Sequence, residues 1–221
     1  MTASRLMATP NGSTATFVAS PFRAALIDLC FERGFSSLTV EQLCRRAGLG
    51  HAAFWHLYAD LEDCFFQTCR GELLRYRRRA AASRAGLGEW RHRLRATAYA
   101  LYRFLDEDER RRRFTVVEAR AAGERPVLLI AEEIETLFDL IDEGRAEPTA
   151  PPSLTRATAE SLGGGIFNEI YVAAAHRGPL PPEAQFVPKL MYSAVLPYLG
   201  QASAAEELEI PPPVPADLAS H

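Results

Sequence analysis

Residues 39–58 constrain the fold of this chain most, and they read TVEQLCRRAGLGHAAFWHLY. Thr39 and Gln42 have the spacing of a capping box, in which each side chain accepts a hydrogen bond from the other residue's backbone amide, so a short helix is predicted to begin there. Gly48 suits the left-handed backbone that ends a helix, and Gly50 allows a second helix to leave at a steep angle. Two short helices joined by a glycine turn are typical of a helix-turn-helix, whose second helix reads DNA.

Elsewhere, glycine and proline divide the chain into segments of helical length, and no strand-like alternation lies between turn residues. The sequence therefore predicts an all-α protein with an N-terminal three-helix head and a helical body. With 221 residues, 48% of them hydrophobic, it can bury a substantial core. The expected division is a flexible arm at 1–19, a helix-turn-helix domain at 20–65, a body at 66–200 and a disordered, proline-rich tail at 201–221.

Individual helix boundaries follow from capping residues. Ser20 as N-cap and Pro21 at the first helical position predict the start of a helix that Gly34 closes. Asp60 is expected to cap a long helix that runs to about Arg84. Later helices are predicted at 89–106, 114–122, 126–144, 154–176 and 185–199, with Arg110–Arg113 in a solvated turn.

The charge of the chain limits the kind of DNA binding that it can support. The formal net charge is −3, so any affinity for DNA has to come from a local patch. Residues 1–64 contain five arginines and six carboxylates (Arg5, Arg23, Arg33, Arg45, Arg46; Asp28, Glu32, Glu41, Asp60, Glu62, Asp63). The head is therefore close to neutral, which weakens the DNA interpretation.

Neither a membrane segment nor enzyme chemistry is indicated. No apolar run reaches the length of a bilayer span, and residues 1–20 lack the order of a secretory signal, so a cytoplasmic location is expected. Glycine-rich phosphate loops, nucleophile elbows and zinc-hydrolase histidine pairs are missing from the sequence, so no catalytic residue, metal or cofactor is predicted. The cysteines are expected to be reduced and to pack as small apolar residues. A thiol enzyme or metal site using Cys64 or Cys69 with His92 remains a distant alternative, since a spacing of five is poor for one helical face.

The stretch from Pro21 to about Phe65 resembles the DNA-binding head of the tetracycline-repressor-like (TetR) family of bacterial transcription regulators. The matching segments are Ala24–Leu26, Glu32–Phe35, Leu38–Val40, Ala47–Leu49, Phe54–Tyr58 and Asp60–Asp63. The resemblance implies a homodimeric, ligand-responsive regulator, with a repressor as the favoured type. Its body at 66–200 is expected to bind a small effector and to dimerise. Its implied partners are a double-stranded DNA operator and an apolar or aromatic small molecule, without a membrane.

The chain departs from the family pattern at four positions on or near the second short helix. Gly50 replaces a usual serine or threonine, Trp55 a tyrosine, Leu57 a histidine and Leu61 a lysine. Each change removes a polar group from the DNA side, although the indole N–H of Trp55 can still donate to a phosphate oxygen. Weaker binding or an unusual sequence preference is expected.

Helical spacing selects the residues predicted to contact DNA. Phe54 and Tyr58 lie four apart and should face the core, which leaves the other side of the helix to the groove. His51 and His56 would supply polar readout, and one or both of the two neighbouring arginines would contact phosphate. The predicted set is Thr39, Arg45, Arg46, Gly50, His51, Ala52, Ala53, Trp55 and His56.

Two further sets of residues are predicted for the body. The effector site is expected among Trp90, Tyr99, Tyr102, Phe104 and Phe114, although aromatic residues at helical spacing also form plain core. Consecutive glycines inside a helix cost stability, and close approach of a partner helix would offset that cost. The predicted dimer interface is Gly163, Gly164, Ile166, Ile170, Leu190, Met191, Ala194 and Tyr198, with packing inside one chain as the alternative.

Two functions stay open at this point. The first is the regulator, in which a ligand in the body tilts the long helix at 60–84 and changes the spacing of the two DNA-reading helices. The second is a helical ligand-binding or protein-interaction module that has lost DNA reading, which the near-neutral head favours.

Overall fold

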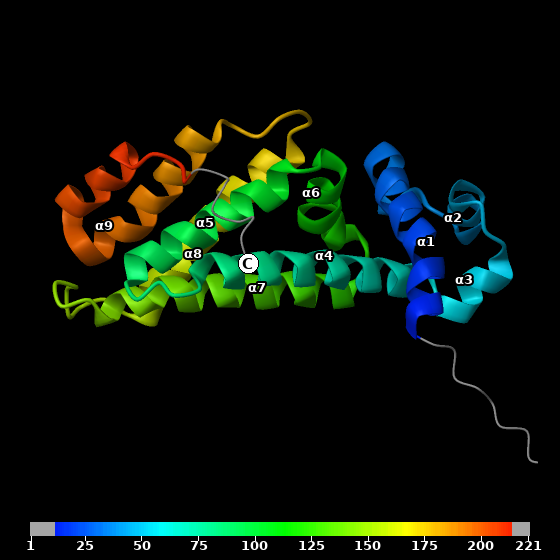
Figure 1. Ribbon diagram of the computed structural model, residues 1–221, viewed down its shortest axis with the longest axis horizontal. Helices are drawn as coiled ribbons and strands as arrows, with labels where there is room; N and C mark the ends of the chain where they lie inside the picture. The colour runs from blue at the N-terminus through cyan, green and yellow to red at the C-terminus, as the bar shows by residue number, and fades with distance from the viewer. Residues whose placement is uncertain (1–11, 214–221) are drawn as a thin grey trace, which may run out of the picture.

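The computed structural model describes residues 12–213, with side chains from Ser20 onward. This part of the chain is helical and contains no strand, which confirms the predicted all-α class (Figure 1). The helices are α1 (Gly12–Arg33), α2 (Val40–Ala47), α3 (His51–Leu57), α4 (Leu61–Arg84), α5 (Trp90–Asp106), α6 (Glu109–Val116), α7 (Glu124–Asp142), α8 (Arg156–Ala175) and α9 (Glu183–Glu209), with short 3-10 turns η1 (Phe35–Ser37), η2 (Glu118–Ala121) and η3 (Glu143–Ala146). We call α1–α3 the head and α4–α9 the body.

The head contains the predicted helix-turn-helix. The Thr39 hydroxyl accepts from the Gln42 amide at 3.2 Å, and the Gln42 side chain accepts from the Thr39 amide at 3.0 Å, so the capping box is confirmed. Gly48 ends α2 with φ of 67°, a left-handed value that favours glycine. Phe54, fully buried, packs edge-on against Phe22 of α1 with ring centroids 5.6 Å apart. This contact fixes the orientation of α3 relative to α1.

Helix α4 joins the head to the body as one continuous element (Figure 1). Its predicted start is confirmed, because the Asp60 carboxylate accepts from the Asp63 amide at 2.7 Å. The core of the head continues along α4 through Phe65 and Cys69 to Leu73. The boundary at residue 65 stays a prediction, and it lies inside this helix.

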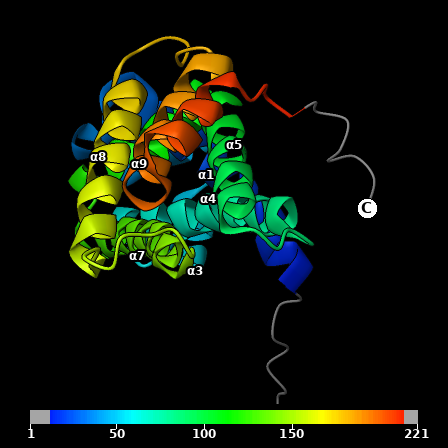
Figure 2. The same cartoon turned by 90° about the vertical axis from the view of Figure 1, so that its left-hand side faces the viewer.

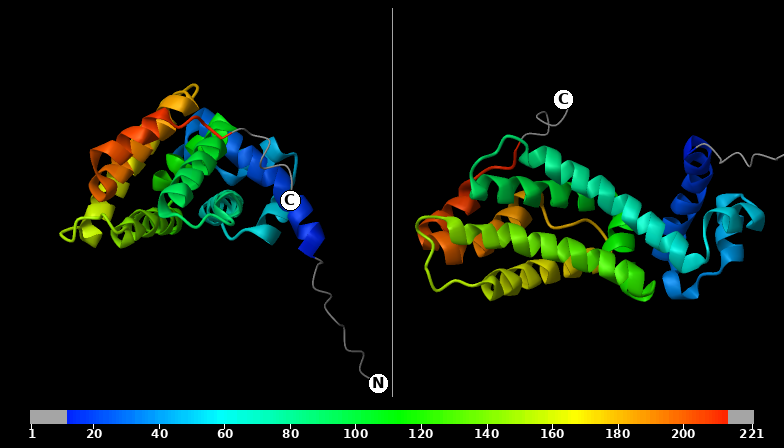
Figure 3. Two further views of the ribbon diagram at one scale, coloured as in Figure 1. Left: turned by 60° about the vertical axis from the view of Figure 1, so that its left-hand side comes forward. Right: turned by 90° about the horizontal axis from the view of Figure 1, so that it is seen from below.

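The body is a bundle in which α4, α5, α7, α8 and α9 surround a second core (Figure 2). Seen from below, α7 lies alongside α4 on one side and α8 on the other (Figure 3). Helix α6 is short and lies between this bundle and α1. No helix within residues 12–213 is long and apolar enough to cross a membrane.

Both predicted ends of the chain need correction. Helix α1 begins at Gly12 and contains Pro21, so residues 12–19 are not a flexible arm; residues 1–11 lie outside the described part. Proline is favoured in the first turn of a helix and removes a hydrogen bond in its interior, so the sequence indicated a start at Pro21, but the helix continues through this residue. The disordered tail is wrong for 201–209, because α9 continues past a kink at Gly200. Residues 214–221 lie outside the described part.

Buried ion pairs hold the continuation of α9 against α5. The Glu207 side chain is 1% exposed and accepts from Arg95 at 2.6 and 2.8 Å and from Arg91. Arg112, which is buried, corrects the turn predicted at 110–113, since it lies inside α6 and donates to the carbonyl oxygens of Leu105 and Gly178. These contacts join residues far apart in the chain, and for that reason local patterns did not predict them.

Candidate functional site

The outer face of α3 presents the side chains predicted to read DNA. His51, Ala52, Trp55 and His56 are exposed, and Trp55 keeps 54% of its surface accessible. Ala53 is only half-buried and packs partly against the head core. Gly50 precedes α3 without a side-chain cap, and an added Cβ there would meet no atom within 4 Å. The outer face of α3 is therefore accessible to a large partner such as double-stranded DNA.

The two arginines predicted to contact phosphate differ in their surroundings. Arg45 is paired only with Glu41, one turn earlier, and its side chain is 73% exposed. Such exposed pairs contribute little and are easily exchanged for another anion. Arg46 donates to Glu32 of α1 at 2.6 Å and also lies 4.0 Å from Asp28. Arg45 is thus available to DNA, whereas Arg46 ties α2 to α1.

Thr39 differs from the other predicted DNA contacts because its hydroxyl is already engaged in the capping box. Its contribution to DNA binding would be indirect, through the placement of α2. The DNA-binding set as a whole stays a prediction.

A cavity of about 180 Å³ lies inside the body, between α4, α5, α6, α7, α8 and α9. Its wall is mostly apolar, as in sites for small apolar ligands. An engineered protein cavity of roughly 150 Å³ holds one benzene molecule, so this space suits a compact molecule. It lies within the same bundle that Figure 2 shows end-on.

The polar side chains on the cavity wall are mostly satisfied by protein groups. Thr97, Thr115 and Thr136 each donate to a carbonyl oxygen one turn earlier in their own helix. Glu133 of α7 accepts from Arg77 of α4 at 2.5 Å, and burial raises the pKa of its carboxyl group. Arg77 and Glu133 therefore connect α4 and α7 at the cavity wall, and the pair carries almost no net charge.

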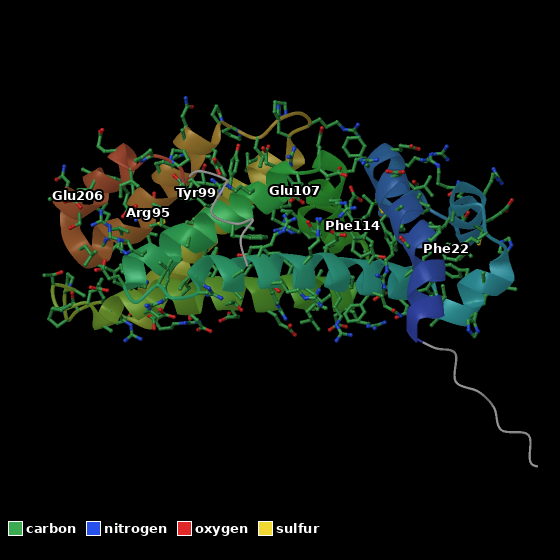
Figure 4. All side chains as sticks on the ribbon, viewed as in Figure 1. Phe22, Arg95, Tyr99, Glu107, Phe114 and Glu206 are labelled. Carbon is green, nitrogen blue, oxygen red and sulfur yellow. The ribbon has the colours of Figure 1, made fainter. Side chains whose placement is uncertain are left out.

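Only two of the five predicted effector residues line this cavity, and the effector site itself stays a prediction. Tyr102 and Phe104 line the cavity, but Trp90, Tyr99 and Phe114 do not. Trp90 packs against Tyr198 and donates to the Leu140 carbonyl oxygen at 2.7 Å. Phe114 lies near the head, while Tyr99 lies farther along the body (Figure 4). The residues that sequence reasoning missed come from other helices, among them Tyr76, Arg77, Glu133, Leu137 and Met191.

Most of the predicted dimer interface is buried within a single chain, which is the alternative that the sequence left open. Seven of its residues lie inside the chain's own core: Gly163, Ile166, Ile170, Leu190, Met191, Ala194 and Tyr198. A Cβ on Gly163 would lie 2.3 Å from the Phe138 ring, so this glycine serves the packing of α8 on α7. Gly164 is exposed, with open space around it, and remains available to a second chain.

The thiols are not arranged for catalysis or metal binding. All four cysteines are free and buried, and burial raises the pKa of Cys64 and of Cys69 to about 12. They are therefore protonated near neutral pH and poor nucleophiles. His92 is exposed and lies beside Glu89, and the described residues contain no cluster of three metal-ligating side chains.

Helix α6 touches both the cavity and the head. Thr115 and Val116 line the cavity. The neighbouring Phe114 ring stacks on Phe65 with centroids 4.1 Å apart, and Arg110 pairs with Asp28 of α1 at 2.7 Å. Just after α6, the buried Glu118 carboxylate accepts from the Phe35 amide at 2.9 Å. A change in the cavity could thus reach the head through α6 as well as through α4.

Comparison with known proteins finds similarity in structure alone. The sequence matches no protein-family model and no curated protein. Among solved structures, the fatty acid degradation regulator FadR from Bacillus halodurans matches with a TM-score of 0.67 at 12% identity, covering 87% of this chain and 97% of that chain. FadR from Bacillus subtilis, in complex with stearoyl-CoA, gives 0.66 at 13% identity over 82% and 98%.

Two other solved structures extend the comparison. A gamma-butyrolactone receptor (ArpA-like protein) gives a TM-score of 0.67 at 14% identity, over 88% of this chain and 95% of that chain. A TetR-like transcriptional regulator from Rhodococcus sp. RHA1 gives 0.64 at 14% identity over 86% and 97%. The matches span the head and the body together, at identities that establish a shared architecture. The chain has the fold of the TetR-type transcriptional regulators.

Proposed function

We propose that this chain is a homodimeric, cytoplasmic regulator of transcription that binds an operator through α3 and is released by a small molecule bound in the body. The observation that carries the proposal is the placement of α6, which lines the cavity with Thr115 and stacks Phe114 on Phe65 beside the head. A protein that only bound a ligand would need no such connection to an exposed helix-turn-helix.

DNA binding is supported by the exposed face of α3 and by Arg45. The alanine methyl group of Ala52 can contact a thymine methyl, and His51 and His56 can form hydrogen bonds with base edges. The Trp55 indole can donate to a phosphate oxygen. Since Arg46 is held by Glu32, phosphate contacts are few, and a shallow dependence of affinity on salt is expected.

An apolar or aromatic effector is supported by the cavity wall and by its size. The FadR structure with stearoyl-CoA and the gamma-butyrolactone receptor share this fold, which supports a small molecule with an apolar part as the class of effector. Ligand binding that shifts α4 or α6 would move α3 relative to its copy in the dimer. Release of DNA would then follow from geometry instead of competition for one site.

Dimerisation is proposed through the outer faces of α8 and α9. Gly164 and Gly165 are exposed on α8 with nothing within 4 Å of an added Cβ, so another helix can approach closely. Val172 of α8 is 59% exposed, and Leu196 of α9 is 37% exposed. A face of small and apolar residues on two adjacent helices suits a four-helix bundle with a second copy.

The DNA-binding proposal is tested by selection from random duplex DNA with the purified chain. An enriched inverted repeat is expected, with His51→Ala relaxing base preference and Arg45→Ala weakening all sequences alike. Arg46→Ala is the matched control, because its side chain is held within the head, and it should change affinity less than Arg45→Ala. Absence of any enriched sequence would favour the alternative, a ligand-binding or interaction module that does not read DNA.

The dimer is tested by light scattering of the wild type and of Gly164→Leu. The wild type should show about twice the chain mass at micromolar concentration, and Gly164→Leu should weaken association by blocking helix approach. A wild-type monomer would refute this part of the proposal.

A further inference from the structure

Tyr76 of α4 stands out among the polar residues on the cavity wall. The hydroxyl of Tyr102, also on the wall, donates to the Pro181 carbonyl oxygen at 2.8 Å. The hydroxyl of Tyr76 makes no hydrogen bond to any residue within 12–213, and its half-buried side chain packs against the core of the body. A hydroxyl without a protein partner, on a side chain that borders a cavity, is available to donate to a bound molecule.

Tyr76 borders the cavity with its hydroxyl protonated. Burial, with a smaller contribution from nearby Glu133, raises the pKa of its hydroxyl to about 12, so the group is protonated at neutral pH and can donate. Tyr76 is nonetheless only partly buried by accessible area, and it is part of the cavity wall. Its hydroxyl is therefore a hydrogen-bond donor without a protein partner on the wall of a mostly apolar cavity.

Each of the three charged residues on the cavity wall is engaged by a protein group. Arg77 and Glu133 neutralise each other across α4 and α7. Arg84, the remaining charged residue on the wall, lies eight residues beyond Tyr76 on α4 and donates its Nε to the Ala80 carbonyl oxygen at 3.2 Å. An ion moved from water into an apolar cavity loses its hydration and needs a direct partner there.

We propose that the cavity binds a compact, uncharged molecule whose single hydrogen-bond acceptor, such as a ketone or ester carbonyl oxygen, receives the hydroxyl hydrogen of Tyr76. This inference rests on the proposed function for its biological meaning, since it names the ligand class and the residue that recognises it. Tyr76 is then the specificity-determining residue of the effector site, and the apolar wall supplies most of the affinity.

The test uses three aromatic probes of similar size: acetophenone, which carries a carbonyl acceptor, isopropylbenzene, which carries none, and benzoate, which is charged. Binding of each to the full chain is measured by isothermal titration calorimetry without DNA. Tyr76→Phe should weaken acetophenone about tenfold and leave isopropylbenzene unchanged, because the substitution removes only the donor. Benzoate should bind more weakly than both to the wild type.

Tyr102→Phe is the matched control. It removes a hydroxyl from the same wall, but that hydroxyl already donates to the Pro181 carbonyl oxygen. It should leave the ratio of acetophenone to isopropylbenzene affinity unchanged. The free Tyr76→Phe protein should unfold at the same temperature as the wild type or at a higher one, whereas a structural hydroxyl would give a loss.

Three results would overturn the inference. They are an equal effect of Tyr76→Phe on acetophenone and isopropylbenzene, tightest binding of benzoate, and no binding of any probe at millimolar concentration. Because DNA is absent from these measurements, failure to select an operator would refute the proposed function and leave the ligand inference standing.

Discussion

The head and the body consist of the same kind of element, the amphipathic helix, but different contacts fix their geometry. In the head, Thr39 and Gln42 cap α2 over three residues, and Gly48 ends it with a left-handed backbone. In the body, Glu207 pairs with arginines on α5 more than a hundred residues earlier, and Gly163 admits the Phe138 ring of another helix. Short-range signals therefore determine the geometry of the head, whereas long-range packing determines the cavity.

The largest expected effect concerns the buried ion pairs at the end of α9. Glu207→Ala leaves Arg91 and Arg95 without their shared carboxylate and should lower the free energy of unfolding by about 3 kcal/mol. Glu206→Ala is the matched control, because Glu206 is 64% exposed, and it should cost less than about 0.5 kcal/mol. Urea denaturation measures both, and equal small losses would show that residues 201–209 do not pack on α5.

The next effect separates two adjacent glycines of α8. Gly163→Ala places a methyl group against Phe138 and should destabilise the body by about 2 kcal/mol through overpacking. Gly164→Ala meets open space and should cost nothing, since alanine is the better helix former. Thermal unfolding of the two variants compares them directly; similar stabilities would contradict the close packing of α7 on α8.

A smaller loss is expected where the head depends on a local signal. Thr39→Ala removes one half of the capping box and should lower stability by about 1 kcal/mol. Ser36→Ala, at an exposed position nearby, should change stability by less than about 0.5 kcal/mol. Denaturant titration distinguishes the two, and no difference between them would mean that tertiary packing, not the cap, holds α2.

The smallest change in stability is expected at the start of α3. Gly50→Ser supplies a capping hydroxyl in open space at a φ of −78°, so it should add only a few tenths of a kcal/mol. The same hydroxyl can contact a phosphate, and affinity for the selected operator should rise several-fold. Gly48→Ser is the control, because its φ of 67° strains any side chain and should reduce stability. Unchanged DNA affinity in Gly50→Ser would place this helix end away from the backbone of DNA.

The sequence predicted the head well for the same reason that it predicted the body poorly. Thr39, Gly48 and Asp60 act within a few residues, so their roles could be recognised without a structure. The helix-forming stripe of α5 was also recognised, but periodicity does not say which side chains border a void. Trp90 therefore proved to be core, while Tyr102 lines the cavity.

Two errors have the same physical origin. The arginine run at 110–113 suggested exposure, yet Arg112 is buried because two distant carbonyl oxygens accept from its guanidinium. The glycine run at 163–165 suggested one interface, yet only Gly163 is packed within the chain and its two neighbours remain open. In both cases the role of the residue depends on a group that is distant in the sequence, and a local pattern does not contain that group.

The most direct test of the account is the thermodynamic coupling between the cavity and α3. Once an operator has been selected, its affinity is titrated with and without a saturating ligand of the cavity, and the affinity of that ligand is titrated with and without saturating operator. The account predicts that ligand weakens operator binding and that operator weakens ligand binding by the same factor. A ligand that occupies the cavity, as shown by its loss of affinity in Tyr76→Phe, but leaves operator affinity unchanged would contradict it.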